Sequence, residues 1–310
     1  MESKPLFLAG PTASGKSEAA LILAQRLGGE IISVDSMQVY RGMDIGTAKP
    51  SIEERARTPH HLIDVVGLNE SFDAARFVQL AREAEGQIHA RGAIPIFCGG
   101  TGLYFNALLR GLGEAPPADL LLRARLERTP LSDLLMELQR ADPEAYQTVD
   151  RQNPRRVIRA VEVVRLTGKP FSAQRARWQS DGSGDSATPI LYLTRGGADL
   201  RKRIDARVEN MFHRGLVEET RQLLSRGLKE NRTATQALGY RQVIEHLAGA
   251  RDLAETIELV KVRTRQYAKR QGTWFRKQPG FRPVEVSPTE SAGQIAERLE
   301  ALYLESLSQR

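Results

Sequence analysis

The stretch that most constrains the fold lies near the start of the chain, where residues 10–17 read GPTASGKS. It matches the phosphate-binding pattern G-x-x-x-x-G-K-[ST], which requires a strand before it and a helix after it. The apolar run Leu6–Ala9 predicts the strand, and apolar residues at helical spacing over Ser17–Leu27 predict the helix. In such a turn, backbone N–H groups surround an anion at the positive end of the helix dipole.

We expect this phosphate loop to contact the ligand through Gly10, Pro11, Thr12, Ala13, Ser14, Gly15, Lys16 and Ser17. Lys16 would add a positive charge, and the Ser17 hydroxyl would ligate a Mg²⁺ ion that bridges the phosphates. The alternative is a glycine turn that joins a strand to a helix and binds nothing. The pattern predicts a phosphate-containing ligand, but it does not identify that ligand.

Further apolar runs predict an α/β fold with a parallel sheet. Residues 30–34, 94–98 and 189–193 read as buried strands. The carboxyl ends of such strands are where ligands bind in open α/β sheets. Asp35 and Thr101 each follow one of these strands, so we expect both beside the phosphate loop. The alternative for Asp35 is that it only caps or turns the chain.

The middle of the chain departs from this alternation. Between residues 112 and 185 the sequence is helical and rich in arginine, and glycine- and proline-rich stretches flank it. We therefore predict a P-loop core formed by residues 1–111 and 186–310, interrupted by an all-helical insertion domain at 112–185.

One predicted helix of the insertion carries positively charged residues near its N-terminus. Asn153 and Pro154 mark its start, with asparagine at the cap and proline in the first turn. Arg155, Arg156 and Arg159 follow directly, where the helix dipole disfavours positive charge. Either an external anion binds these arginines, or they form a solvated face that pairs with nearby carboxylates.

Two further groups of basic residues lie after residue 189. Arg203 and Arg207 stand one helical turn apart, so both could reach a phosphate or pair with Asp205 or Glu209. Residues 261–277 hold seven lysines and arginines, no acidic residue, and three aromatic residues. Such a mixture suits contact with unstacked bases and backbone phosphates. The alternative is a core helix with aromatics facing inward and charges facing water, which leaves the missing acids unexplained.

Composition narrows the class of protein. The chain has 310 residues, 41% of them hydrophobic, and a net charge of +7, which favours a polyanionic partner such as nucleic acid. The single cysteine, Cys98, excludes an intramolecular disulfide and a cysteine metal cluster, as suits the reducing cytoplasm. We expect no membrane span, because no apolar stretch approaches about 20 residues. We expect no signal peptide either, because the first strand follows residue 4 almost directly.

Together these residues resemble the tRNA dimethylallyltransferases, also called isopentenyl-diphosphate:tRNA transferases. Besides the phosphate loop, the matching stretches are SVDSMQVYRGMDIGTAKP at 33–50, GGTGLYF at 99–105, NPRRVIRAVE at 153–162, LGYRQ at 238–242 and RQYAKRQGTW at 265–274. They follow the family's order over nearly the whole chain, and residues 33–50 are the most specific. Between residues 127 and 143 the chain is slightly shorter than is usual in the family.

The resemblance implies a kinase-like P-loop core that holds the diphosphate of dimethylallyl diphosphate and transfers no phosphoryl group. The dimethylallyl group would move to N6 of adenosine-37 in tRNA, and diphosphate would leave. Asp35 would take the proton of the adenine amine, Thr101 would contact the target nucleotide, and Arg207 would stabilise the diphosphate. Mg²⁺ at Ser17 is the implied cofactor, and the family suggests a monomer.

The resemblance also implies contacts with the tRNA anticodon stem-loop, whose target base must leave the stack. These contacts come from strand ends of the core, from the insertion and from the last third of the chain: Asp35, Ser36, Met37, Gln38, Thr101, Arg123, Arg155, Arg156, Val157, Ile158, Arg159, Gln236, Gly239, Tyr240, Arg241, Lys269, Arg270, Gln271, Trp274 and Arg276.

Two other functions compete with this one. A small-molecule or nucleoside kinase would use the same loop for ATP, but it has no need of the basic and aromatic stretch at 261–277. A non-catalytic, nucleotide-switched RNA-binding protein leaves Asp35 and Thr101 without a role. Incorporation of label from dimethylallyl diphosphate or from ATP into tRNA separates the three.

Overall fold

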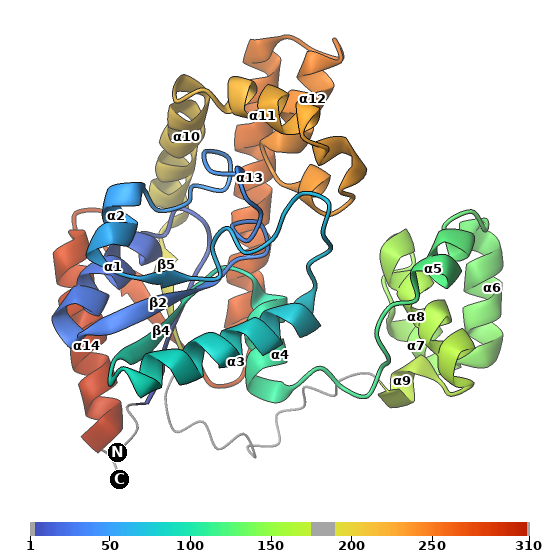
Figure 1. The fold of residues 1–310 in the computed structure, drawn as a ribbon, viewed down its shortest axis with the longest axis horizontal. Coiled ribbons are helices and arrows are strands. Elements are labelled where there is room, and N and C mark those ends of the chain that lie inside the picture. The colour runs from blue at the N-terminus through green and yellow to red at the C-terminus, as the bar shows by residue number, and fades with distance from the viewer. Residues whose placement is uncertain (1–3, 175–189, 309–310) are drawn as a thin grey trace. The chain divides into compact units, whose positions relative to one another are not determined.

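The structure is a computed structural model that describes residues 4–174 and 190–308 (Figure 1). The chain divides into two compact units, one formed by residues 1–105 and 183–310 and the other by residues 106–182. We call them the core unit and the helical unit. The expected start of the insertion, residue 112, lies shortly after the division at residue 106, and its expected end, residue 185, lies outside the described residues.

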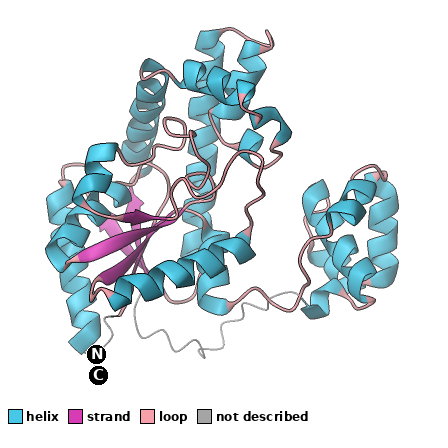
Figure 2. Ribbon diagram, viewed as in Figure 1, coloured by secondary structure: helices cyan, strands magenta, loops and turns pink. Residues whose placement is uncertain are grey.

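A parallel sheet forms the centre of the core unit (Figure 2). Its described strands are β1 (Leu6–Ala9), β2 (Gly29–Val34), β3 (His60–His61), β4 (Ile94–Gly99), β5 (Ile190–Arg195) and β6 (Phe281–Val286). They lie in the order β3-β2-β4-β1-β5-β6. The order reverses at β1, and the crevice outside the carboxyl ends at such a reversal is where α/β folds bind ligands. The predicted α/β fold with a parallel sheet is confirmed.

Helices cover both faces of this sheet. Those of the core unit are α1 (Lys16–Leu27), α2 (Ile52–Arg57), α3 (Ala74–Ala90), α4 (Gly102–Arg110, which runs into the helical unit), α10 (Gly197–His213), α11 (Leu216–Ser225), α12 (Tyr240–Leu247), α13 (Leu253–Arg276) and α14 (Ala292–Ser308), with 3-10 turns η1 (Leu228–Glu230) and η2 (Ala234–Gln236). Because both faces are covered, the central strands β1 and β4 read as nearly continuous apolar runs.

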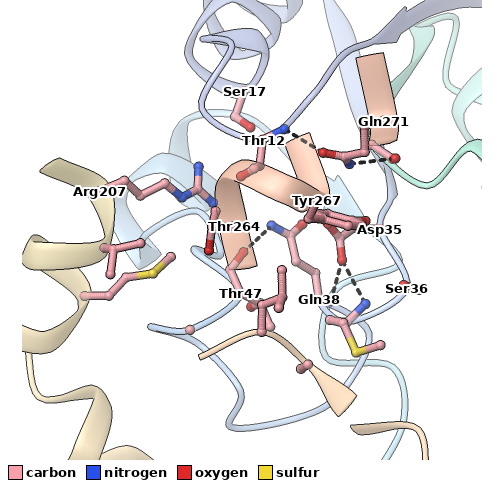
Figure 3. Close-up of a pocket in the computed structure, with 18 of the residues that line it drawn as sticks. Thr12, Ser17, Asp35, Ser36, Gln38, Thr47, Arg207, Thr264, Tyr267 and Gln271 are labelled. Carbon is pink, nitrogen blue, oxygen red and sulfur yellow. Dashed lines mark hydrogen bonds between the residues drawn. The ribbon is translucent and has the colours of Figure 1, made fainter. Parts of the chain in front are cut away.

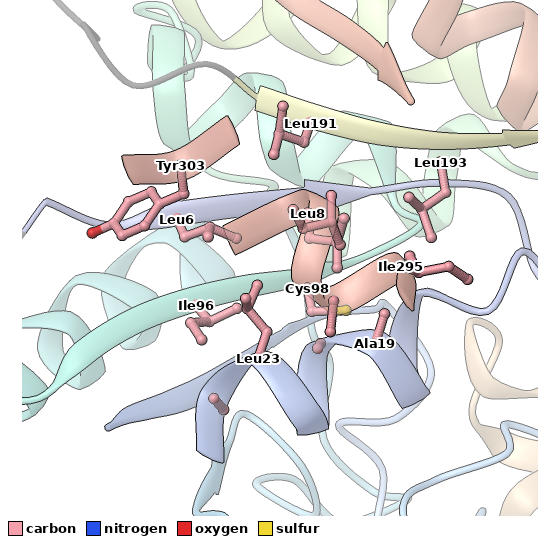
Figure 4. Close-up of a cluster of buried hydrophobic side chains, with 14 of the residues drawn as sticks. Leu6, Leu8, Ala19, Leu23, Ile96, Cys98, Leu191, Leu193, Ile295 and Tyr303 are labelled. Carbon is pink, nitrogen blue, oxygen red and sulfur yellow. The ribbon is translucent and has the colours of Figure 1, made fainter. Parts of the chain in front are cut away.

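Successive residues of β1 pack on opposite faces of the sheet. Leu6 and Leu8 belong to the hydrophobic cluster formed with Leu23 of α1 and Leu299 of α14, part of which Figure 4 shows. Phe7, between them, stacks on Phe97 of β4 with ring centroids 4.9 Å apart. This packing fixes β1, and therefore the loop that follows it, between two helical layers.

The glycines after β4 allow close packing. A Cβ on Gly102 would lie 2.5 Å from the ring of Trp274, which comes from α13. We predict that Gly102→Ala lowers the free energy of unfolding by about 1–3 kcal/mol through overpacking.

Gly272 lies on the same helix as Trp274, and a Cβ there would meet open space. Gly272→Ala should therefore stabilise the fold by up to about 1 kcal/mol through helix propensity. Thermal melts of both variants measure this, and equal melting temperatures would contradict it.

The helical unit has its own core. Its complete helices are α5 (Leu120–Leu126), α6 (Leu131–Ala141), α7 (Pro143–Thr148), α8 (Pro154–Thr167) and α9 (Phe171–Gln174). Leu126, Leu138 and Val161 are buried together. Asn153 and Pro154 begin α8 as predicted, although the asparagine side chain makes no capping hydrogen bond.

Candidate active site

A pocket of about 390 Å³ opens at the carboxyl ends of β1, β2 and β4 (Figure 3). All of its lining residues belong to the core unit. Of the residues proposed from the sequence, those that line it are Thr12, Lys16, Ser17, Asp35, Ser36, Met37, Gln38, Arg207, Gln236, Arg270 and Gln271. The structure therefore gathers at one place the phosphate loop, the ends of two further strands, and residues that lie beyond position 200 of the chain.

Lys16 extends into this pocket from the first turn of α1. Its Nζ donates a 3.1 Å hydrogen bond to the Pro11 carbonyl. Burial lowers the pKa of the Lys16 ammonium, so a positive charge here is poorly solvated. A bound anion would compensate for that lost solvation, and a turn ending at a helix N-terminus is suited to hold one.

Two arginines hold the phosphate loop from outside. The Arg203 Nε donates to the Ala13 carbonyl at 2.9 Å, and the Arg195 Nε donates to the Ser14 carbonyl at 2.8 Å. Ala13 has a positive φ of 63°, a conformation that costs energy for a residue with a Cβ. The arginines therefore fix the carbonyls of a strained turn at the start of α1.

The two roles left open for Arg203 and Arg207 are now separated. Arg207 lines the pocket, and burial lowers the pKa of its guanidinium. Arg203 contacts the loop backbone. The nearby acids pair elsewhere, Asp205 with Arg265 and Glu209 with Lys261.

Asp35 lies in a tight turn directly after β2. Its Oδ1 accepts hydrogen bonds from the backbone N–H of Met37 at 2.8 Å and of Gln38 at 3.2 Å. These bonds fix the carboxylate at the pocket wall and do not use Oδ2. The adjacent Ser36 N–H donates to Thr101 Oγ1 at 3.2 Å. Thr101 is thus beside the Asp35 turn, although it is not among the residues that line the pocket.

Gln271 connects the two loops at the sheet edge. Its Oε1 accepts from the Thr12 N–H at 2.9 Å, and its Nε2 donates to the Gly100 carbonyl at 2.8 Å. The side chain is buried and both ends of its amide are bound. Gln271 therefore supports the phosphate loop, so we do not retain it as a tRNA contact.

An apolar part of the pocket lining was not predicted from the sequence. It consists of Val208, Met211, Leu238 and Val260, with Tyr267 beside them. Burial and the nearby Asp35 charge raise the pKa of the Tyr267 hydroxyl, which stays protonated. Helical spacing could have indicated two of these residues, because Val208 and Met211 lie one and four positions after Arg207 and so share the pocket side of α10 with it.

Cys98 also lines the pocket, but its thiol is unreactive. Its thiol donates to the Lys16 carbonyl at 3.8 Å. Burial raises the pKa of Cys98 to about 11. The thiol is therefore protonated at neutral pH and is not a nucleophile.

Several residues expected to touch tRNA serve the fold instead. Val157 and Ile158 are buried in the helical unit's core, and Tyr240 is completely buried in the core unit. A buried side chain cannot reach an RNA, so we withdraw these three from the proposed contacts. Gly239 is also buried, with a φ of 89° at the start of α12, and its N–H donates to Gln242. Gly239 therefore serves to form the turn at which α12 begins.

Glu162 binds two of the insertion's arginines. Its carboxylate is fully buried and accepts hydrogen bonds from Arg123 and, at 2.8 Å, from Arg159. The alternative in which arginines pair with nearby carboxylates is therefore correct for Arg159. Arg155 and Arg156 are exposed at the start of α8.

The basic residues of α13 divide in the same way. Lys261 and Arg265 pair with acids of α10, which explains why no acid is needed within the stretch itself. Lys269, Arg270 and Arg276 are exposed, and Arg270 lies 5.9 Å from the centre of the Tyr267 ring. On α12, exposed Arg241 pairs with Glu245 and Gln236. Trp274 is half-buried beside Lys269 and Arg270, and the three line one shallow surface pocket.

Within residues 4–174 and 190–308, no group of three or more His, Cys, Asp or Glu side chains is placed to hold a metal ion. Across the same residues, no helix has the length and apolar character needed to cross a bilayer.

Comparison with known proteins gives one consistent answer. The family model described as IPP transferase matches residues 38–278. The tRNA dimethylallyltransferase 1 of Trichlorobacter lovleyi is 46% identical over 94% of this chain and 96% of its own length, and the tRNA dimethylallyltransferase of Geobacter sulfurreducens is 45% identical over 92% of each.

Solved structures agree over almost the whole chain. The tRNA isopentenylpyrophosphate transferase of Bacillus halodurans has a TM-score of 0.70 and 38% identity, covering 99% of this chain and 98% of that one. A eukaryotic dimethylallyltransferase acting on tRNA has a TM-score of 0.82 and 29% identity, covering 99% of this chain and 80% of that one. Sequence and fold agree over the pocket as well as the helical unit, and this chain belongs to the IPP transferase family.

Proposed function

We propose that this chain transfers the dimethylallyl group of dimethylallyl diphosphate to N6 of adenosine-37 in tRNA and releases diphosphate. The observation that supports this most directly is the composition of one pocket. Its lining divides into the charged phosphate loop, a set of apolar side chains, and the Asp35 carboxylate. A prenyl diphosphate has the same division into a charged and an apolar part.

Asp35 is the proposed general base. The exocyclic amine of adenine is a weak nucleophile, because its lone pair is delocalised into the ring. A carboxylate within hydrogen-bond reach can take the amine proton as the C–N bond forms. The backbone bonds to Asp35 Oδ1 hold the carboxylate in one orientation, and Thr101 is bonded to the same turn. We propose that Thr101 contacts the target nucleotide there.

The diphosphate would bind the loop, where Lys16 and Arg207 can stabilise the charge that develops on the leaving group. Mg²⁺ fits this site, because it is usually held by few protein oxygens together with phosphates and water. The Ser17 hydroxyl is exposed and lines the pocket, so it can be such a ligand. When bound, the ion would neutralise part of the diphosphate charge.

A labelling experiment tests the proposal against its competitors. Unmodified tRNA is incubated with the protein and either dimethylallyl diphosphate labelled in the prenyl group or ATP labelled in the γ-phosphate. We expect prenyl label in the tRNA and none from ATP. Phosphorylation or ATP hydrolysis without prenyl transfer would favour a kinase. We propose that the monomer is active.

Exposed cations of α13 and the residue after it are proposed to bind the anticodon stem-loop. Each phosphate contact releases counterions, so losing one should lower the slope of log affinity against log salt by roughly 0.7–0.9. Lys269→Ala combined with Lys277→Ala should therefore lower the slope by about 1.4–1.8. Both side chains are exposed and line the same surface pocket. Filter binding of tRNA across a salt series measures the slope.

Arg26→Ala is the matched control for that pair. Arg26 is in the last turn of α1, at the end away from the phosphate loop, where it pairs with Glu300. It should leave the slope unchanged. Arg156→Ala tests the helical unit in the same way, whereas Arg159 is unsuitable because it pairs with buried Glu162. An unchanged slope in the α13 double variant would remove this helix from the RNA interface.

A further inference from the structure

The loop between β2 and α2 forms part of the pocket wall through Gly46 and Thr47. A carboxylate far along the chain binds the backbone of this loop. Glu219 of α11 accepts hydrogen bonds from the N–H groups of Asp44 at 3.1 Å, Ile45 at 2.8 Å and Gly46 at 3.3 Å. Three consecutive amides thus surround one side chain, as they would surround a bound anion.

Tyr240 completes this arrangement from α12. Its hydroxyl donates to Glu219 Oε1 at 2.5 Å and accepts from the Gly46 N–H at 3.1 Å. The ring packs so closely on Gly46 that a Cβ there would overlap it. We call Glu219 and Tyr240 the loop clamp. No side chain larger than hydrogen fits at position 46 beside the Tyr240 ring.

The opposite side of the loop is bonded to the Asp35 turn. Gln38 Nε2 donates to the carbonyls of Thr47 at 3.2 Å and Ala48 at 3.3 Å, and its Oε1 accepts from the Ser33 hydroxyl. The Gln38 N–H in turn donates to Asp35 Oδ1. A continuous series of hydrogen bonds therefore runs from Glu219 through the loop and Gln38 to Asp35.

We infer that Glu219 and Tyr240 are positioning residues for prenyl transfer, because they fix the loop that orients the Asp35–Gln38 turn. This rests on the proposed function of the pocket. The phosphate loop is held by other residues, namely Arg195, Arg203 and Gln271. Disturbing the clamp should therefore affect the chemical step and not the binding of the diphosphate.

The test compares Glu219→Gln and Tyr240→Phe with a matched control, Glu218→Gln. Glu218 is the neighbouring exposed residue on α11 and pairs with Arg221 on its own helix. In Glu219→Gln an amide replaces the charge that the three N–H groups face, and kcat for prenyl transfer should fall roughly tenfold, as for one lost bond to a charged group. Tyr240→Phe should lower kcat less, because Glu219 keeps its backbone donors. Glu218→Gln should match the wild type.

Separate measurements of kcat and KM distinguish a positioning role from a purely structural one. We expect the KM for dimethylallyl diphosphate to stay within about twofold in both clamp variants. Lower melting temperatures with unchanged kcat in both variants would overturn the inference, as would a raised KM for dimethylallyl diphosphate at normal kcat. If Glu219→Gln does not fold, Tyr240→Phe decides alone. A wild type without transfer activity would overturn the proposed function, and the inference with it.

Discussion

Asp35→Asn is expected to lower kcat for prenyl transfer by roughly 10²–10⁴-fold, the size of effect that a lost general base produces. Asparagine keeps an Oδ1 that can accept from Met37 and Gln38, so the turn after β2 should keep its shape. The variant loses the negative charge and with it the ability to take a proton. Single-turnover assays at saturating substrate measure the chemical step directly.

Binding and stability are the controls for that variant. The melting temperature and the dissociation constant for tRNA should change little, because the fold contacts of Asp35 are retained. A turnover close to that of the wild type would remove Asp35 from the mechanism. Loss of tRNA binding of the same size as the loss of turnover would show that Asp35 acts in binding.

Lys16→Met should weaken dimethylallyl diphosphate binding by roughly 10- to 100-fold, the range for one lost bond to a charged group. Without ligand, however, the variant should be at least as stable as the wild type. Burial lowers the pKa of Lys16, which means that its charge is poorly solvated in the folded protein. Methionine has similar length and carries no charge, so that unfavourable burial disappears.

Thermal shift with diphosphate separates these two effects. Adding diphosphate should raise the melting temperature of the wild type, because a ligand that binds the folded state stabilises it. The shift should be much smaller in Lys16→Met. Equal shifts in both proteins would mean that Lys16 does not contact the phosphates, and tight ATP binding with hydrolysis would favour a kinase.

Local patterns in the sequence were sufficient to predict the centre of the fold. The phosphate loop, the strand ends at Asp35 and Thr101, and the start of α8 at Asn153 each depend on neighbouring residues only. Gln271 and Tyr240 show what such patterns do not contain. Both belong to stretches that resemble RNA contacts, yet the structure buries them against backbone far away in the chain.

Burial within a helix was the second source of error. Val157 and Ile158 lie between arginines, and only the packing of α8 shows that they face the core. The apolar part of the pocket lining was missed for the related reason that valine and methionine on a helix usually indicate core packing. The clamp residue Glu219 belongs to no motif, and its role depends on a loop over 170 residues earlier.

The bond between Thr12 and Gln271 joins residues 259 positions apart. Ribosomes make the phosphate loop first and α13 among the last elements, and β1 must also wait for its neighbour β5. The helical unit, whose contacts are local, can fold while the later chain is still being made. An unfinished chain therefore has a phosphate loop without its amide partner, and ligand binding should appear only after α13 leaves the exit tunnel.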